Sequence, residues 1–426
     1  MSLAVLVIGM FLLMFLSMPI AFAIGVASLL SFLVEGTIGM TMIPQRMYAA
    51  LNSWPIMAIP LFMTAGILMD RSGITERLIK FANALIGFVS GSVGMVAVVA
   101  SMLFAAISGS STANVAATGS MTIPAMKKQG FDPAFAASVE ATASAIGPVI
   151  PPSILMIVLG HITETSIARL FLAGLLPGVL VGIGALFIVN SYSRRTGQGA
   201  VPDYKFSWSN LLLTAKNAIP GLLMPLIIIL GIILGVFTAT EAAGVAVVYG
   251  IFIAMVFYRT VGIRDLPNIL MESAILSSAV MFIVTTAYIL GWLITVYRVP
   301  YLLGQFLDLY VESPVVFLII VNVVFILLGM LLESFTAIIV FVPILFPVAL
   351  DYGIDPVHFG LIVCVNLAVG YITPPYGATL YVASGIAETP VTRTSRFILP
   401  FITVMVAVLL LTTYFPRVFL WLPGLI

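Results

Sequence analysis

Long stretches without a charged residue constrain this chain more than any short motif does. The first, Leu3 to Val34, is 32 residues long, and a helix needs about 20 apolar residues to span a bilayer. Similar apolar runs recur along the 426 residues, of which only 8% are charged, whereas soluble domains carry roughly 25%. The runs also lack the polar and apolar alternation of outer-membrane strands. The sequence therefore predicts an all-α polytopic membrane protein and excludes a soluble enzyme.

The scarce charged, cysteine and histidine residues exclude further classes. A net charge of +1 provides no basic field that would attract nucleic acid. The single Cys364 cannot form an internal disulfide. His161 and His358 lie far apart, so a zinc or haem site lacks ligands. Residues 1–34 have no basic n-region and no small-residue cleavage site, so we expect retained helices and not a signal peptide.

The second half of the chain repeats features of the first at an offset of 223 residues. Glycines and aspartates match at this offset, as at Asp132 and Asp355 or Gly147 and Gly370. Prolines are too infrequent, at about 5% of residues, for many such matches to arise by chance. Five prolines of the first half nevertheless have a proline at the matching position: 124 with 347, 133 with 356, 151 with 374, 152 with 375, and 177 with 400. We infer an internal repeat.

This repeat predicts the domain organisation. Each copy is expected to hold about five transmembrane helices and one re-entrant hairpin. The expected segments are a first repeat at 1–192 with a hairpin at 92–127 and a broken helix at 133–160, a polar cytoplasmic linker at 193–218, and a second repeat at 219–426 with a hairpin at 314–350 and a broken helix at 356–386.

Charges indicate that the two repeats are inverted in the membrane. The turn after the first hairpin carries Lys127 and Lys128, whereas the matching turn carries only the acids Asp351 and Asp355. Because cytoplasmic loops are enriched in Lys and Arg, we expect the first turn inside and the second outside. This arrangement places both termini on the outer, periplasmic face.

Two kinds of polar feature interrupt the apolar segments. The first hairpin turns at Ser108–Asn114, a run of small polar residues, and such backbone survives at membrane depth only when protein or a polar cavity surrounds it. Either close packing of small residues or a cation site made of oxygen ligands would explain this run. The segments 147–153 and 370–376 each contain a Pro-Pro pair. These pairs release the carbonyls of residues 147, 148, 370 and 371, although a plain kink is the alternative.

Acidic residues within the membrane are functional candidates because they are costly to bury. Glu333, at the turn of the second hairpin, is expected to bind a cation or to cap the next helix. Glu140, and the amide of Asn366, are expected to form hydrogen bonds between helices. No Lys or Arg falls beside the hairpin turns or the breaks, so an anionic substrate would need bound cations and helix dipoles to offset its charge.

Together, the sequences SGSSTAN, GPVIPPS, GYITPPYG, KKQGFDP and DYGIDP resemble the large membrane subunit of tripartite ATP-independent periplasmic (TRAP) transporters, the DctM-like group that handles dicarboxylates and sialic acid. The resemblance implies sodium-coupled uptake of organic acids across the bacterial inner membrane by an elevator mechanism. It also implies two partners, a periplasmic substrate-binding protein and a small four-helix membrane subunit.

The resemblance further implies which residues bind the coupling ions and the substrate. One sodium site would comprise Ser108, Ser110, Ser111, Thr112, Asn114, Gly147 and Ile150. The second would comprise Glu333, Ser334, Thr336, Gly370 and Thr373. The substrate would contact Pro152, Ser153, Pro375 and Tyr376.

Two alternatives remain open at this point. A stand-alone sodium/anion symporter of similar architecture would need no binding protein. An intramembrane serine protease could use Ser110 or Ser111, but it would lack a base, because we expect both histidines to lie outside the membrane core.

Overall fold

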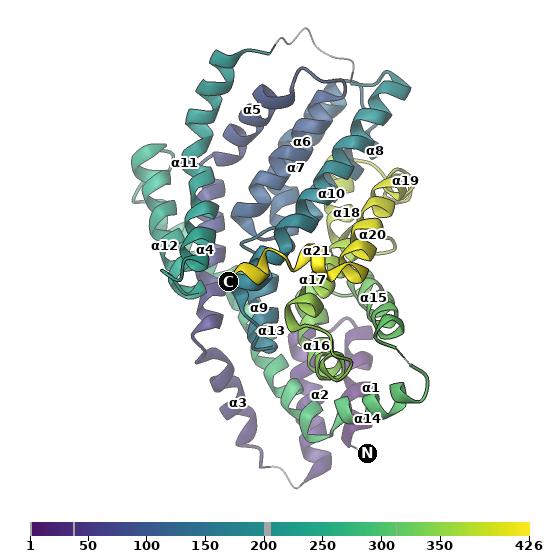
Figure 1. Cartoon of the computed structure of the whole chain (residues 1–426). Coiled ribbons are helices and arrows are strands. Elements are labelled where there is room, and N and C mark those ends of the chain that lie inside the picture. The colour runs from purple at the N-terminus through teal and green to yellow at the C-terminus, as the bar shows by residue number, and fades with distance from the viewer. Residues whose placement is uncertain (1, 37–38, 200–205, 312) are drawn as a thin grey trace.

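The computed structural model describes residues 2–36, 39–199, 206–311 and 313–426. These residues form helices and connecting loops, and no β-strand occurs among them. Figure 1 shows an elongated bundle in which early and late segments of the chain lie side by side. The predicted all-helical fold is confirmed. Residues 200–205 of the predicted linker lie outside the described part, and the helices on either side extend to Thr196 and begin again at Trp208.

Two helical units of matching construction occupy the centre of the chain. The first unit consists of α6 (Ser92–Ser108), α7 (Ser111–Lys128), α8 (Pro133–Ala145) and α9 (Ile154–Ile162). The second unit consists of α15 (Pro314–Leu331), α16 (Ser334–Asp351), α17 (Pro356–Ile372) and α18 (Ala378–Ala387). In each unit a tight turn joins the first two helices, and a cis Pro-Pro pair lies between the last two. The starts of α7 and α8 recur 223 residues later, at α16 and α17.

The remaining helices surround the two units. They are α1 (Ser2–Phe15), α2 (Ile20–Glu35), α3 (Met42–Leu51), η1 (Pro55–Met57), α4 (Ala58–Arg71), α5 (Ile74–Ile86), α10 (Ile167–Thr196), α11 (Trp208–Ile233), α12 (Ala239–Phe252), η2 (Ile253–Phe257), α13 (Leu266–Val296), α14 (Val299–Asp308), α19 (Val391–Phe397), α20 (Leu399–Tyr414), α21 (Pro416–Phe419) and η3 (Pro423–Leu425).

Several helices are long and apolar enough to cross a bilayer. By length and composition six described helices qualify, or eight if two bent pairs each count as one span. One bent pair joins α3 to η1 and α4 at 61°, and the other joins α19 to α20 at 56°. The helices α6, α17 and α18 are apolar but shorter. Short helices flanking a break are typical of segments that end inside the membrane.

The two units interlock by a reciprocal exchange. Helix α18 packs against α7 and α8 of the first unit, while α9 packs against α16 and α17 of the second. Each unit therefore lays the second half of its broken helix on the hairpin of the other. Reciprocal contacts of this kind are the signature of a two-fold relation between the partners.

Outside the units, α13 is the central packing element. It contacts α2, α3 and α4 on one side and α16 on another, and α4 also packs against α12, α6 and α9. We call α2, α3, α4, α11, α12 and α13 the frame. The frame meets the units along α6, α9 and α16.

An aspartate followed by a proline fixes the start of α8 and, in the second unit, of α17. Asp132 accepts a hydrogen bond from Ala134 N at 2.9 Å, and Asp355 accepts one from Val357 N at 2.8 Å. A proline at the first helical position follows each cap. Both choices are favourable, because the cap satisfies a free N–H and proline at this position loses none.

A buried carboxylate ties together three helices of the first unit. Glu140 of α8 is fully buried and accepts hydrogen bonds from Ser101 (2.6 Å), Thr122 (2.7 Å) and Ser144 (3.1 Å), and from Thr118. The expected bonding of Glu140 between helices is confirmed. Gly119 leaves the room for this side chain, since a Cβ there would lie 3.0 Å from Glu140 Cγ.

We predict that Glu140→Ala destabilises the protein because four buried hydroxyls lose their shared acceptor. The expected loss in free energy of unfolding is about 2–4 kcal/mol, measured by titration with a denaturing detergent. Glu140→Gln keeps an acceptor oxygen and should lose less. The control Glu272→Ala removes an exposed carboxylate paired with Arg71. A loss for Glu140→Ala no larger than that of this control would contradict the structural role.

Candidate functional site

The tip of the first hairpin lies directly against the break of its own unit. Gly109 has a φ of +60°, and a Cβ at this position would lie 2.7 Å from Pro152 O. A Cβ at Gly147 would lie 3.2 Å from Ser111 N. Glycine is therefore required on both sides, because any larger residue would separate the two backbones. Of the residues predicted for the first sodium site, the structure thus brings Ser110 and Ser111 into contact with Gly147 across this junction.

The side chains of the first tip divide into those already bonded and those that are not. Ser110 caps α7 by accepting from Ala113 N at 3.5 Å. Asn114 donates to Ser101 O at 2.9 Å and so faces the Glu140 cluster. Ser111 is buried, and its hydroxyl has no hydrogen-bond partner among the described residues.

Three other residues predicted for this site have mixed environments. Ser108 is buried at the end of α6, whereas Thr112 is exposed. The Ile150 side chain packs on α10, since a Cβ at Gly178 would lie 2.5 Å from Ile150 Cγ1. Of Ile150, only the backbone therefore remains a plausible ligand.

The tip of the second hairpin shows the same pattern with different residues. Glu333, which aligns with Ser110, caps α16 by accepting from Phe335 N at 3.0 Å. Ser334 aligns with Ser111 and is likewise fully buried; its hydroxyl lies near Tyr371 but makes no hydrogen bond of normal geometry. Thr336 is fully buried, and its hydroxyl has no partner within the described chain.

Gly370 differs from its counterpart in what it contacts. A Cβ at Gly370 would lie 2.4 Å from the carbonyl carbon of Gly329, so this glycine permits close packing of α17 on α15. Gly147, by contrast, adjoins the hairpin turn itself. Thr373 ends α17 and donates its hydroxyl to Val369 O at 2.6 Å.

The prediction that both breaks expose free carbonyls is wrong for most of them. Pro148 O accepts the Ser153 hydroxyl at 2.6 Å, and Tyr371 O accepts the Thr379 hydroxyl at 2.9 Å. Gly370 O accepts Thr373 N at 3.1 Å. Hydroxyl side chains placed just after each break therefore replace the helical donors that proline removes.

The residues predicted to contact substrate lie in unlike environments. Ser153 is fully buried and caps α9 by accepting from Met156 N at 3.3 Å. Pro152 is also buried. Pro375 and Tyr376 are exposed, with 57% of Tyr376 accessible. In this arrangement only the second break presents a surface to a ligand.

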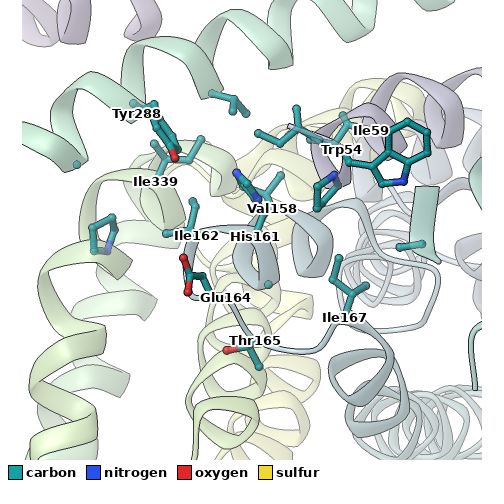
Figure 2. Close-up of a pocket in the computed structure, with 18 of the residues that line it drawn as sticks. Trp54, Ile59, Val158, His161, Ile162, Glu164, Thr165, Ile167, Tyr288 and Ile339 are labelled. Carbon is teal, nitrogen blue, oxygen red and sulfur yellow. The ribbon is translucent and has the colours of Figure 1, made fainter. Parts of the chain in front are cut away.

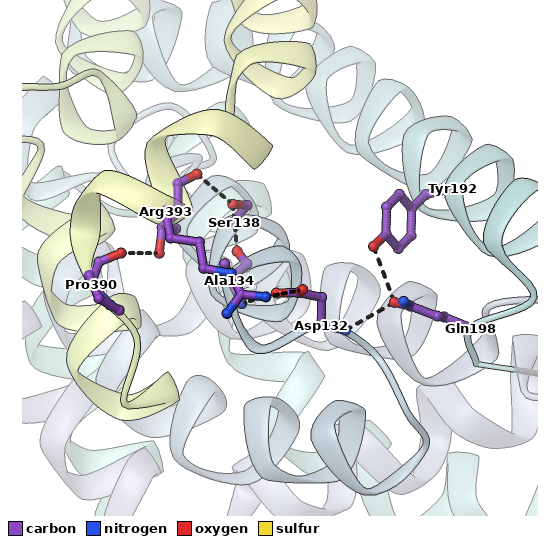
Figure 3. A network of polar contacts seen from close by, with 8 residues as sticks. Asp132, Ala134, Ser138, Tyr192, Gln198, Pro390 and Arg393 are labelled. Carbon is purple, nitrogen blue, oxygen red and sulfur yellow. Dashed lines mark hydrogen bonds and ion pairs between the residues drawn. The ribbon is translucent and has the colours of Figure 1, made fainter.

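Beyond the tips, a polar network joins the base of the first unit to the end of the second (Figure 3). Asp132 forms an ion pair with Arg393 at 2.6 Å, and Ser138 donates to Thr394 O at 3.2 Å. Nearby, Lys127 donates to Ala387 O at 3.1 Å. The turn after α7 therefore lies beside the C-terminal end of α18.

A second polar location is a cavity of about 750 Å³ between the frame and the two units. Figure 2 shows His161 within it, flanked by Tyr288 and Trp54. Sequence reasoning missed this cavity, because its walls come from segments far apart in the chain. The second histidine corrects another expectation: His358 is buried and its ring bonds Thr412 O at 2.9 Å, although both histidines were expected outside the core.

Comparison with known proteins places this geometry in a family. Residues 7–418 match the family model described as "Tripartite ATP-independent periplasmic transporter, DctM component". The C4-dicarboxylate TRAP transporter large permease protein DctM of Pseudomonas aeruginosa is 38% identical over 402 residues, covering 94% of each chain. The sialic acid TRAP transporter large permease protein SiaM of Vibrio cholerae is 35% identical over 97% of this chain and 96% of its own.

Two further matches are to a longer protein and to a solved structure of low sequence identity. The isethionate TRAP transporter permease protein DctMQ of Oleidesulfovibrio alaskensis is 37% identical over 95% of this chain but only 64% of its own length. The crystal structure of the Alcanivorax borkumensis YdaH transporter superposes with a TM-score of 0.62 over 89% of this chain and 88% of its own, at 15% identity. This likeness shows a shared fold. The chain therefore belongs to the DctM family of TRAP transporter large permease subunits, as its motifs suggested.

Proposed function

We propose that this chain is the large membrane subunit of a sodium-coupled transporter that imports organic acids across the bacterial inner membrane. The observation that carries the proposal is the pair of buried, unpartnered hydroxyls at matching positions of the two tips, Ser111 and Ser334. Buried polar groups are nearly always hydrogen-bonded. A hydroxyl left without a partner at two equivalent tips calls for a ligand at each.

Sodium fits these tips better than other ligands do. Hard monovalent cations bind hydroxyl and carbonyl oxygens, and Thr336 adds a third unpartnered hydroxyl in the second unit. The exposed Thr112 and the capping oxygens of Ser110 and Glu333 lie at the same turns. These residues would hold the ions through oxygen atoms that the fold leaves free.

An anionic substrate would bind beside these ions. The residues assigned to the two sodium sites and to the substrate include no Lys or Arg. Burying a carboxylate without an opposite charge is costly. Bound sodium would supply that charge, so that substrate and ions favour each other's binding, which is the thermodynamic basis of coupled transport.

The contacts between the units support an inverted arrangement. The end of α18 and the following α19 adjoin the base of the first hairpin, through Lys127 with Glu388 at 3.6 Å and Arg393 with Asp132 at 2.6 Å. If the units were parallel, the end of α18 would lie on the side of the membrane opposite to this base. Inversion together with the Lys and Arg distribution puts both termini on the periplasmic side.

An elevator mechanism suits the division between frame and units. The two units exchange α9 and α18 and so pack on each other's hairpins, whereas their main contacts with the frame run along α6, α9 and α16. Helices α5 and α14 connect the frame to the hairpins that follow them in the chain. We propose that the units move together as one body while α5 and α14 act as arms.

The family name and the relatives suggest the partners and the substrate class. Relatives are named for C4-dicarboxylate, sialic acid and isethionate, all of which are organic anions. We propose that a small four-helix membrane subunit and a periplasmic binding protein complete this transporter. A stand-alone sodium/anion symporter is the alternative.

We predict that Thr336→Val weakens the binding of sodium without lowering the stability of the protein. Valine has the shape of threonine, and the hydroxyl it replaces makes no hydrogen bond to any residue that the structure describes. The sodium concentration for half-maximal uptake should rise about tenfold or more, as for the loss of one polar contact. The exposed Thr403→Val is the matched control. An unchanged sodium titration would remove Thr336 from the site.

Reconstitution distinguishes the proposed system from the stand-alone alternative. The chain is placed in vesicles with and without its small membrane subunit, and labelled organic acid is added with or without the periplasmic binding protein. We expect uptake only when all three proteins and an inward sodium gradient are present. Uptake by the chain alone, unchanged by the other two proteins, would instead identify a stand-alone symporter.

A further inference from the structure

The cavity between the frame and the units is built from both bodies. Frame residues on its wall include Arg46 of α3 and Tyr288 and Trp292 of α13. The units contribute His161 of α9 and Ile339 of α16. A volume of about 750 Å³ lies within the roughly 300–1,000 Å³ of typical small-molecule sites.

The charged residues of this wall are few, and they come from the frame and from the loop after α9. Arg46 and Glu164 are the two formally charged residues among those that line it. Arg46 lies over the Trp292 ring, with Cζ 5.2 Å from the ring centroid. Arg46 takes part in none of the ion pairs of the described residues. Its charge is therefore supported by an aromatic face and not cancelled by a carboxylate.

Neutral donors complete the polar part of the wall. Tyr288 lies parallel to His161, with ring centroids 6.4 Å apart. The Nε2 atom of His161 is shielded from solvent and has no hydrogen-bond partner in the described part of the chain. Figure 2 shows the two rings among the residues that line the cavity, which also include the apolar Val158 and Ile59. One guanidinium, two polar rings and an apolar floor together suit a small organic carboxylate.

We propose that this cavity is a vestibule that binds the carboxylate of an organic acid at Arg46, before the acid reaches the hairpin tips. The inference rests on the proposed function, in which the substrate is imported. The vestibule would then lie on the outer face, where the Lys and Arg distribution puts the α9–α10 loop. Because Arg46 belongs to the frame and Glu164 lies in the loop that directly follows α9 of the first unit, sliding of the units would change the charge that faces the ligand.

The test measures binding in the absence of sodium, so that the hairpin sites contribute little. The full chain is placed in lipid nanodiscs with choline replacing sodium, and succinate and N-acetylneuraminate are titrated as separate probes. Trp54 and Trp292 both line the cavity and report binding through their fluorescence, and replacing both with Phe should abolish that signal. We expect saturable binding of at least one probe.

Removing the charge of Arg46 and removing that of Glu164 should change the affinity for the probe in opposite directions. Arg46→Gln should weaken binding about tenfold or more, whereas Glu164→Gln should tighten it because a repelling carboxylate is removed. Arg417→Gln, an exposed residue outside the cavity, should change nothing. Arg46→Lys should bind between wild type and Arg46→Gln, since lysine keeps the charge but loses the fork geometry.

Several outcomes would overturn the vestibule. It fails if wild type binds neither probe without sodium, and sodium-driven uptake by the full system would then still support the proposed function. It also fails if Arg46→Gln binds normally while Thr336→Val abolishes the signal, because the signal would then come from the hairpin site. Affinity that rises steadily from butanoate to decanoate would identify a pocket for lipid tails.

Discussion

The central constraint on this structure is that backbone cannot remain unsatisfied at membrane depth. Each unit interrupts a helix with a Pro-Pro pair, and each interruption must find other partners for its carbonyls and N–H groups. The structure finds them locally, through the hydroxyls of Ser153 and Thr379 and through the N–H of Thr373, which donates to Gly370 O. Within the described tips, the buried hydroxyls of Ser111, Ser334 and Thr336 keep no hydrogen-bond partner.

The hydroxyls without a hydrogen-bond partner connect the fold to the proposed function. Because the carbonyls of the breaks are mostly bonded, the oxygens left for ions are the side chains of the tips, above all Ser111, Ser334 and Thr336. Those residues sit on hairpins held by the reciprocal packing of α9 and α18. In the elevator mechanism that we propose, the two tips move as parts of one body, so the ions and the substrate would travel together.

Much of this arrangement could be predicted from the sequence, because prolines and small polar residues act locally. The repeated prolines located both hairpins and both breaks, and Glu140 followed from the cost of a buried charge. The sequence could not reveal contacts between distant segments, such as Asp132 with Arg393 or Arg46 with Trp292. It also overestimated the free carbonyls, since the capture of Tyr371 O by Thr379 depends on a turn geometry that proline alone does not define.

The inverted relation of the two units is tested most directly by labelling from each side of the membrane. Lys128 and Asp351 are exposed at equivalent turns, and the native Cys364 is fully buried, so single cysteines at these turns can be read without background. With a membrane-impermeant maleimide, Lys128→Cys should react only from the cytoplasmic side and Asp351→Cys only from the periplasmic side. Reaction of both from the same side would contradict the inverted arrangement.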